Sequence, residues 1–410
     1  MADIQVKWYH SMMRGIPIMN GQVGRLITYL DAVLVNGFGQ TTVTTANVVD
    51  GILTLNITNS ETFQKYTVVN ITGDDQLKGD HRVIESANTY IKIALNIPNQ
   101  TFTGTFYVKY ASLGWSKLTM AAQPNMALYV PKSSYSGFNL AVNDTYGSAA
   151  FVRICRGATN PANFADFNTL IDSVPIYTSA TDRSYWAKNY TNNTATTANF
   201  LIGDGSTIYY QWGQTNGTNG YDNLRTGKMV GCGDIIRYME EDTLSAFLVC
   251  GMIAASSLPS LSSSSIRQSM QVMSTLNSWN DGAGHSTFLG NVRGEKGNDT
   301  AFRTPDGPFF GSWSGYGTNW VDWAVNGTGL ELNKLLACSE RVVRGEYPGI
   351  YTLPFDFGGV DDMLIEEGSG DMAGRLIMFK CMSSGNTSYD NSSPSGATSV
   401  MAFDITGPWR

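Results

Sequence analysis

Histidine is the first residue type to consider for chemistry, because it supplies most general bases and many metal ligands. The chain of 410 residues has only three, His10, His81 and His285. It contains no G-x-S-x-G, H-E-x-x-H or G-x-x-x-x-G-K-S/T motif, which are the patterns of hydrolase nucleophiles, zinc helices and phosphate-binding loops. We therefore predict no catalytic residue, no cofactor and no enzyme activity.

Carboxylates are the second candidates, since a hard divalent cation needs several of them close together. Five lie between residues 361 and 371, and three are consecutive at residues 240–242. Neither run has the fixed spacing of a calcium-binding loop. A solvated acidic turn is the simpler interpretation of both runs, and we predict no metal site.

Tryptophans concentrate between residues 276 and 328, among many Gly and Asn. A pair of carboxylates beside such rings could form a groove that cleaves glycosides. A sugar-binding face without catalysis is an alternative, because stacking needs only exposed rings and a few amides. The sequence pairs no particular acids, so both interpretations stay open.

The charge and the cysteines exclude other classes of function. Charged residues make up 15% of the chain, and the net charge is -7. Binding to nucleic acid through phosphates needs clustered Lys and Arg, so we expect no nucleic-acid partner. No apolar run approaches the roughly 20 residues that span a bilayer, and the first ten residues lack the apolar core of an export signal. We expect a chain that is made in a cytosol, with no insertion into a membrane.

The cysteines number five, are scattered and have no C-x-x-C spacing. This pattern predicts reduced, mostly buried thiols at Cys155, Cys232, Cys250, Cys338 and Cys381.

One helix is predicted near the N-terminus. Apolar residues recur there at the three/four spacing of an amphipathic helix, about three and a half turns long, at Val23, Leu26, Ile27, Leu30, Val33 and Leu34. Asn20 is the expected N-cap, and Asn36-Gly37 is a typical stop. This helix is expected to pack on a β-sheet of its own chain, or else on a neighbouring copy of the chain.

The rest of the chain is predicted to be mainly β. Residues 41 to about 118 alternate with a two-residue period between turn signals, as in a small sandwich or barrel. A second series of strands begins at Met126, and the Gly203-Asp204-Gly205 turn is predicted to join two of them through positive φ at its glycines. We predict several β-sandwich-like or barrel-like domains and one N-terminal amphipathic helix. The expected units are residues 1–120 and 121–410, with a further division near residue 230 left open.

Several further predictions concern single segments. A short helix is expected around residues 164–171, inside a long loop. Tyr185-Trp186 is expected to be core rather than an exposed contact. Residues 244–253 form an apolar run that suits either a strand buried on both faces or a buried helix turn. Strands are predicted at residues 330–338, 350–353 and 376–381, and at the C-terminus before Gly407-Pro408.

Segments at both ends and in the middle resemble an uncharacterised family of virion proteins of tailed bacteriophages. That family has an extended Lys-aromatic-aromatic-His/Ser opening, a helix of the form L-I-x-x-L-D-A-x-L, and a terminal N-G-F-G. The matching positions are Lys7 to Ser11, Pro17, Asn20-Gly21, Leu26 to Leu34 and Asn36 to Gly39. Further segments that resemble it are Leu77 to Val83, Leu113 to Lys117, Leu201 to Gly205 and Phe403 to Trp409. The chain departs from the pattern at Met12 to Arg14 and between residues 255 and 330.

The resemblance implies a structural component of the virion, from the tail, baseplate or neck, which is synthesised in the cytoplasm of the bacterial host. It implies partners that are other copies of the chain and other virion proteins, and no catalytic residues. Low charge and many aromatic residues agree with such a role, because the cores of protein interfaces are depleted in Lys and Glu. The alternatives are a host-surface or carbohydrate-binding module, with a host-surface glycan as partner, and a polysaccharide depolymerase.

The assembly surface is expected to lie on the helix and on both ends of the chain. Its predicted residues are Lys7, Trp8, Tyr9, His10, Leu26, Leu30, Leu34 and Trp409. The aromatic-basic opening is expected to be exposed. Deletion of residues 1–20 is accordingly predicted to leave a folded, soluble chain that no longer enters particles.

Overall fold

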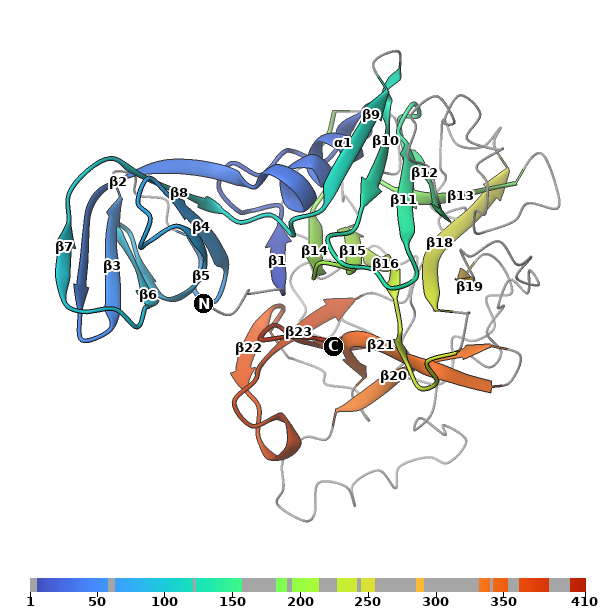
Figure 1. Cartoon of the computed structure of the whole chain (residues 1–410). Coiled ribbons are helices and arrows are strands. Elements are labelled where there is room, and N and C mark those ends of the chain that lie inside the picture. The colour runs from blue at the N-terminus through green and yellow to red at the C-terminus, as the bar shows by residue number, and fades with distance from the viewer. Residues whose placement is uncertain are drawn as a thin grey trace.

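The computed structural model describes most of the chain, and it is mainly β, as the sequence predicted (Figure 1). The described residues form three sheets, a short helical segment near the N-terminus and one 3-10 turn near the C-terminus. The described residues are 6–57, 63–120, 123–156, 182–189, 194–213, 227–241, 245–254, 285–290, 332–339, 342–352, 361–382 and 399–410.

The first sheet is a small closed barrel, drawn in blue in Figure 1. Its strands are β2 (Phe38–Val49), β3 (Ile52–Ile57), β4 (Val68–Thr72), β5 (Gly79–Ala87), β6 (Tyr90–Ala94), β7 (Gln100–Phe102) and β8 (Phe106–Tyr110). The order β3-β6-β5-β4-β8-β2 closes because β2 also pairs with β3, and β7 adds to the rest of β2. Leu53, Leu55 and Ile57 are buried while Thr54 and Asn56 are half-buried. This alternation is the two-residue period that predicted the barrel.

The second sheet is the largest and has eleven strands. They are β1 (Lys7–His10), β9 (Ser116–Met120), β10 (Gln123–Val130), β11 (Phe138–Asn143), β12 (Ala149–Arg156), β13 (Asp182–Ala187), β14 (Asn199–Gly203), β15 (Thr207–Gly213), β16 (Gly227–Asp234), β18 (Ala246–Ala254) and β19 (His285–Gly290). They pair in the order β1-β14-β15-β16-β18-β13-β12-β11-β10-β9, with β19 beside β18. Strands β1 and β9, from the first 120 residues, therefore belong to this sheet and not to the barrel.

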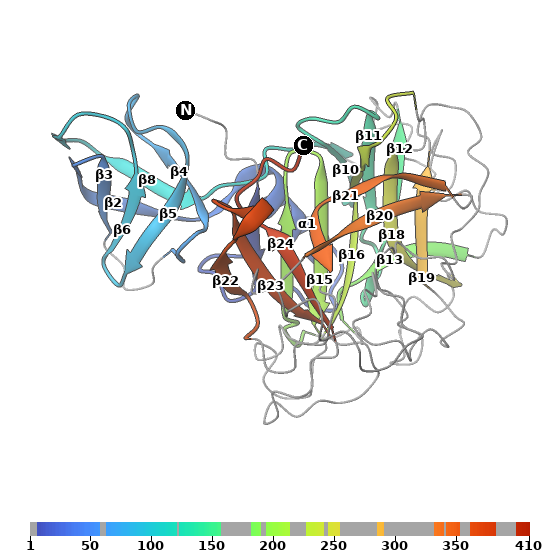
Figure 2. The ribbon, with the colours of Figure 1, turned by 90° about the horizontal axis from the view of Figure 1, so that it is seen from below.

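The third sheet contains the C-terminal strands. It comprises β17 (Ile236–Arg237), β20 (Asn333–Ser339), β21 (Val342–Thr352), β22 (Leu364–Glu367), β23 (Leu376–Met382) and β24 (Ser399–Asp404), with the 3-10 helix η5 (Gly370–Met372) after β22. The predicted strands at residues 330–338, 350–353 and 376–381 correspond to β20, β21 and β23, and the apolar run at residues 244–253 corresponds to strand β18. Figure 2 shows this sheet, in red, in front of β15 and β16.

Strand β15 lies between two layers, which explains why its sequence, TIYYQWG, has little polar alternation. The ring of Tyr209 packs against Phe403 of the third sheet, with centroids 5.8 Å apart. The next residue, Tyr210, faces the opposite side and packs against Tyr29 and Trp186. The sequence of a strand that is covered on both faces is a nearly continuous apolar run.

The predicted helix is present, but it begins later than expected. It consists of α1 (Arg25–Leu30), continued by a π-helix, η1 (Asp31–Asn36), that ends at Gly37 with φ 71°. The stop at Asn36-Gly37 is confirmed. The predicted N-cap is wrong, because Gly24, with φ 79°, precedes the helix and Asn20 Oδ1 instead accepts a hydrogen bond from the Gln22 N–H.

The apolar face of this helix packs inside its own chain. Leu26, Leu30 and Leu34 are fully buried, whereas Val23 lies before the helix and is 46% exposed. The Tyr129 hydroxyl, on β10, donates to the Ile27 carbonyl at 3.1 Å. The helix therefore covers the second sheet, which is the first of the two expected packings.

The hairpin between β14 and β15 confirms one part of its prediction and corrects another. Asp204 Oδ1 accepts the backbone N–H groups of Ser206 and Thr207 at 2.8 and 2.7 Å, as expected for an aspartate in a tight turn. Neither Gly203 nor Gly205 has positive φ, so the predicted reason for these glycines is wrong. At Gly203 a Cβ would lie 2.5 Å from the Thr207 carbonyl oxygen, so close approach of the two strands requires the glycine.

The structure also describes Tyr185-Trp186 and four of the cysteines, but not two other segments for which the sequence made predictions. Tyr185 and Trp186 are 1% and 0% exposed and belong to the core, as expected. Four cysteines are buried free thiols, as predicted, at Cys155, Cys232, Cys250 and Cys381. The predicted helix at 164–171, and the tryptophan-rich region apart from β19, lie outside the described residues.

Candidate functional site

Five segments that are far apart in the sequence come together where the barrel meets the second sheet. In β1, Lys7 pairs with Gly203 and Trp8 pairs with Ile202 of β14. The opening of the chain therefore lies directly beside the Gly203-Asp204-Gly205 turn, about 200 positions later in the sequence. We call this region the junction, and define it as β1, the 203–207 turn, residues 77–83, residues 111–115 and residues 403–410.

Lys7 joins the barrel to the second sheet through a partly buried ion pair. Its Nζ donates to Asp80 Oδ2 of β5 at 2.6 Å and also to the Ser112 carbonyl. The other carboxylate oxygen, Asp80 Oδ1, accepts from Asn70 Nδ2 at 2.7 Å. The Lys7 side chain is 6% exposed and that of Asp80 is 23% exposed. These partners offset the cost of burying the Lys7 ammonium, and the ion pair connects β1 of the second sheet to β5 of the barrel.

The Leu113-Gly114-Trp115 segment connects the junction to the helix. The Trp115 indole N–H donates to the Asp204 carbonyl at 3.0 Å. The backbone N–H groups of Leu113 and Trp115 donate to the carbonyls of Val33 and Leu34. These carbonyls belong to the last turn of η1, whose free acceptors need partners outside the helix.

The C-terminus completes the junction. Arg410 Nη2 donates to Thr207 Oγ1 at 2.6 Å and to the Asp234 carbonyl at 2.9 Å. From the barrel, the Arg82 guanidinium reaches the Thr406 carbonyl at 3.5 Å. The Trp409 indole N–H donates back to the Asp404 carbonyl at 2.7 Å. The last residues of the chain thus contact both the barrel and the second sheet.

All eight residues predicted as an assembly surface are buried inside the chain. Relative exposures are at most 5% for Lys7, Trp8, Tyr9, His10, Leu26, Leu30, Leu34 and Trp409. The expectation of an exposed aromatic-basic opening is wrong. Side chains alternate along β1, so Lys7 and Tyr9 contact the barrel and its linker, while Trp8 and His10 stack together on the other face. Both faces of the strand are covered.

His10 uses both of its ring nitrogens at this site. Nδ1 accepts the Met12 N–H at 3.2 Å, so Nε2 carries the hydrogen that is donated to Gln64 Oε1 at 2.8 Å. Burial is the main cause that lowers the pKa of His10, with the nearby Lys380 ammonium adding to it and the Gln64 hydrogen bond and Asp362 opposing it. A second proton on the ring would face the Met12 N–H and lie near a cation.

We expect His10 to make the folded state more sensitive to acid. Its pKa is lowered in the folded state, so below the unfolded value of 6.5 the unfolded chain binds more protons, and stability falls as the pH falls. Denaturant unfolding of the wild type and His10→Gln at pH 8 and pH 5.5 isolates this contribution, because other titrating groups, including Asp144 and His81, are common to both. The free energy of unfolding of the wild type should exceed that of His10→Gln by less at pH 5.5 than at pH 8. An equal difference at both pH values would show that His10 does not contribute.

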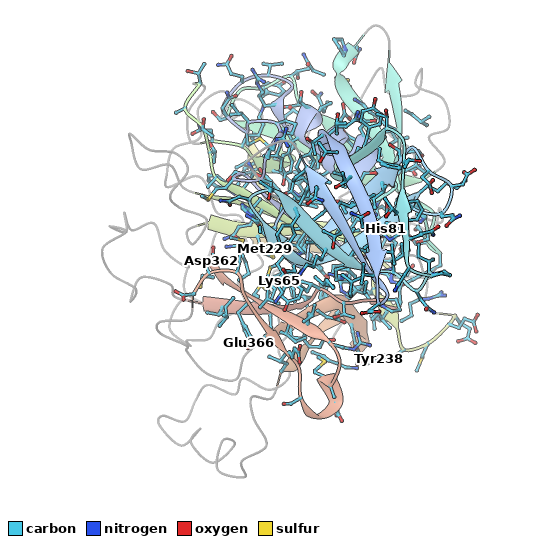
Figure 3. All side chains as sticks on the ribbon, turned by 90° about the vertical axis from the view of Figure 1, so that its left-hand side faces the viewer. Lys65, His81, Met229, Tyr238, Asp362 and Glu366 are labelled. Atoms are coloured by element: carbon cyan, nitrogen blue, oxygen red, sulfur yellow. The ribbon has the colours of Figure 1, made fainter. Side chains whose placement is uncertain are left out.

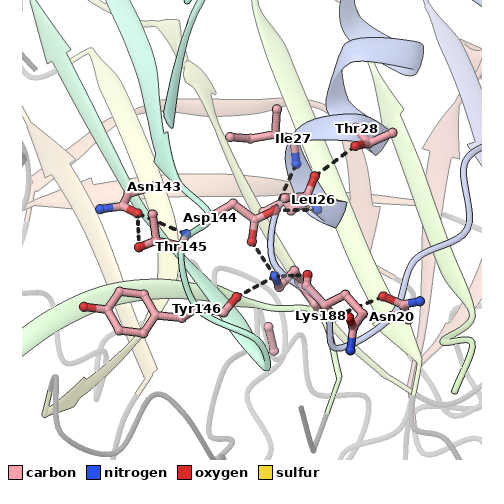
Figure 4. Close-up of polar contacts among 12 residues, drawn as sticks. Asn20, Leu26, Ile27, Thr28, Asn143, Asp144, Thr145, Tyr146 and Lys188 are labelled. Carbon is pink, nitrogen blue, oxygen red and sulfur yellow. Dashed lines mark hydrogen bonds and ion pairs between the residues drawn. The ribbon is translucent and has the colours of Figure 1, made fainter. Parts of the chain in front are cut away.

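A second buried polar group, Lys188, lies at the base of the helix (Figure 4). Its Nζ forms an ion pair with Asp144 Oδ1 and donates to the carbonyls of Gln22 and Tyr146 at 2.8 Å each. Both charged side chains are 0% exposed. Asp144 follows β11 and Lys188 follows β13, so the pair connects two strand ends to the segment before the helix.

The Asp144 carboxylate also caps the helix. Its Oδ2 accepts the N–H groups of Leu26 at 2.7 Å and Ile27 at 3.2 Å, which satisfies two of the free donors of the first turn. Burial raises the pKa of Asp144 to about 6, although Lys188 and these N–H groups oppose the shift. A residue that is remote in sequence therefore provides the cap that Asn20 was expected to provide.

Asp144 and Lys188 were not among the residues predicted from the sequence. Lys188 lies two residues after the buried pair Tyr185-Trp186, and a charge at the end of an apolar strand is a signal that it needs a partner. No local pattern identifies that partner, because the two residues are 44 positions apart.

The acidic runs do not form a metal site in the part of the chain that the structure describes, where no three His, Cys, Asp or Glu side chains gather around one point. Asp362 instead accepts hydrogen bonds from Lys380 Nζ on both of its oxygens, at 2.7 and 2.9 Å, and one from the Cys381 N–H at 2.8 Å. Figure 3, with the barrel toward the viewer, shows Asp362 to the left of Lys65 of the barrel and Glu366 below Lys65. Glu366 and Glu240 are exposed.

Comparisons of the chain with protein-family models, with curated proteins and with solved structures each found no match. Neither α1 nor any other helix among the described residues has the length and apolar content needed to cross a membrane.

Proposed function

We propose that the chain is a structural component of a tailed-bacteriophage particle, in the tail, baseplate or neck. It holds its barrel at a fixed position on a layered β body and associates with copies of itself and with other virion proteins. One observation carries the proposal. Five of the segments that resemble the virion family are scattered from residue 7 to residue 409, yet they meet at the junction.

The contacts of the junction are those of a scaffold. Lys7, Asp80 and Trp115 each direct a polar group at a fixed partner in another part of the fold, and such buried polar pairs favour one arrangement over others. A rigid arrangement of two parts is what a repeating assembly requires, because each copy must present the same surface to its neighbours.

The test is to locate the chain in the particle of the phage that encodes it. We expect mass spectrometry of purified particles to find the chain, and a cryo-EM map to place several symmetry-related copies of the barrel and the body. Particles that contain no copy of the chain would overturn the proposal.

The carbohydrate-binding and depolymerase alternatives depend on residues 276–328, of which the structure describes only β19. No described contact favours either alternative. A glycan array and an assay for released reducing sugar, run on the purified chain, would detect them directly.

A further inference from the structure

We propose that Lys188 and Asp144 condense into an isopeptide bond, so that the folded chain cross-links itself between the ends of β13 and β11. The two side chains are in hydrogen-bonded contact and are both 0% exposed. This inference is independent of the proposed role in a virion.

The nucleophile is held in place on three sides. Lys188 Nζ donates to Asp144 Oδ1, to the Gln22 carbonyl at 2.8 Å and to the Tyr146 carbonyl at 2.8 Å. Figure 4 shows the Lys188 side chain beside Asp144 and the Tyr146 carbonyl. Two groups that are held in contact in this way react as if at very high concentration.

The electrophile has donors where negative charge would develop. Oδ2 of Asp144 accepts the backbone N–H groups of Leu26 and Ile27, while Oδ1 faces the amine. Attack on the carboxyl carbon moves charge onto Oδ2, and two fixed N–H donors stabilise charge on an oxygen in a dry site. Burial also favours neutral groups, since it raises the pKa of Asp144 and lowers that of Lys188.

The reaction balances without any co-reactant. One proton passes from Nζ to Oδ1 along the existing hydrogen bond, which leaves a neutral amine beside a neutral carboxylic acid. The Nζ lone pair forms the C–N bond, and the carbonyl electrons move onto Oδ2. The C=O bond then re-forms as the C–Oδ1 bond breaks, and Oδ1 leaves as water with a second proton from Nζ. The remaining N–H of the amide can donate to Gln22 or Tyr146.

Other ion pairs in the described residues lack this arrangement. Asp362 receives Lys380 Nζ on both of its oxygens and the Cys381 N–H on Oδ1, so no oxygen is left to two backbone donors alone. The Lys117–Asp31 pair is partly open to water, with side chains 17% and 25% exposed. We therefore expect a single cross-link.

The test is the mass of the purified, folded full-length chain, measured after denaturation. We expect a mass lower than that of the sequence by one water molecule, and a proteolytic fragment in which the peptides of residues 144 and 188 are joined. Lys188→Arg keeps the positive charge but removes the nucleophile, so it should restore the full mass. Lys117→Arg is the matched control and should retain the loss of water.

Two results would overturn the proposal. One is a folded wild-type chain with the full mass of its sequence and separate peptides for residues 144 and 188. The other is a loss of water that persists in Lys188→Arg, because the link would then lie elsewhere.

Discussion

Deletion of residues 1–20 is expected to leave an unfolded or aggregated chain. The deletion removes β1 from the second sheet together with five buried apolar side chains, Val6, Trp8, Tyr9, Met13 and Met19. Each is worth roughly 1.5–3 kcal/mol of burial, so the total is comparable to the 5–15 kcal/mol that stabilises a typical domain. The deletion also leaves Asp80 without Lys7. Circular dichroism of the truncated chain should show loss of β-structure, and limited proteolysis should show faster cleavage than in the full-length chain.

Two exposed residues of the same segment provide the control. Met12 is 60% exposed and Ile18 is 49% exposed, so Met12→Ser and Ile18→Ser should change the free energy of unfolding by less than about 0.5 kcal/mol. A truncated chain that stays soluble and unfolds cooperatively would contradict the expected collapse. It would instead support the sequence-based prediction that residues 1–20 serve assembly alone. A role of the opening in assembly therefore has to be tested with point substitutions and not with truncation.

Asp144→Ala is expected to be the most damaging single substitution. It leaves Lys188 buried with no opposite charge, which costs about 3–5 kcal/mol. It also removes the acceptor of the Leu26 and Ile27 N–H groups, a loss of about 1 kcal/mol for a helix cap. The midpoint of urea unfolding should fall sharply, to the point where part of the population is unfolded in buffer.

The double replacement Asp144→Leu with Lys188→Met tests whether the unpaired charge of Lys188 causes the instability of Asp144→Ala. It removes both charges, and apolar residues of similar volume often replace a buried pair at little cost. We therefore expect the double variant to be more stable than Asp144→Ala. None of these variants can form the proposed isopeptide bond, so this ordering does not depend on it. Lys78→Ala is the control, because its pair with Asp75 is exposed and should contribute less than about 1 kcal/mol. A double variant as unstable as Asp144→Ala would show that the unpaired charge is not the cause.

The deletion and the substitutions at Asp144 and Lys188 all remove polar contacts between segments that are distant in the sequence. The junction and the Asp144–Lys188 pair both join segments that are far apart in the chain, and both do so with buried charges. Loss of one partner is most costly for the Asp144–Lys188 pair, because the remaining charge is 0% exposed and cannot regain its hydration. The arrangement of barrel, helix and sheets thus depends on a few polar contacts as well as on the apolar core.

The strands show how much a local pattern can predict. In β3, Leu53, Leu55 and Ile57 face the core and the residues between them do not, so a two-residue period identifies the strand and its buried face together. Strand β15 was predicted as well, but its two covered faces become evident only from the layers on either side. The helix was identified by its apolar spacing, whereas its start was not, because the cap comes from Asp144 and not from a neighbouring residue.

The amino-acid sequence by itself determined that the chain is mainly β, where most described strands lie, and which face of the N-terminal helix is apolar. These features follow from side-chain spacing over a few residues, which any one segment carries alone. Only the tertiary structure decided that Lys7 to His10 form a buried strand, and that Asp144 and Lys188 meet. Burial depends on what covers a segment, and ion pairing depends on which distant residues the folded sheets bring into contact.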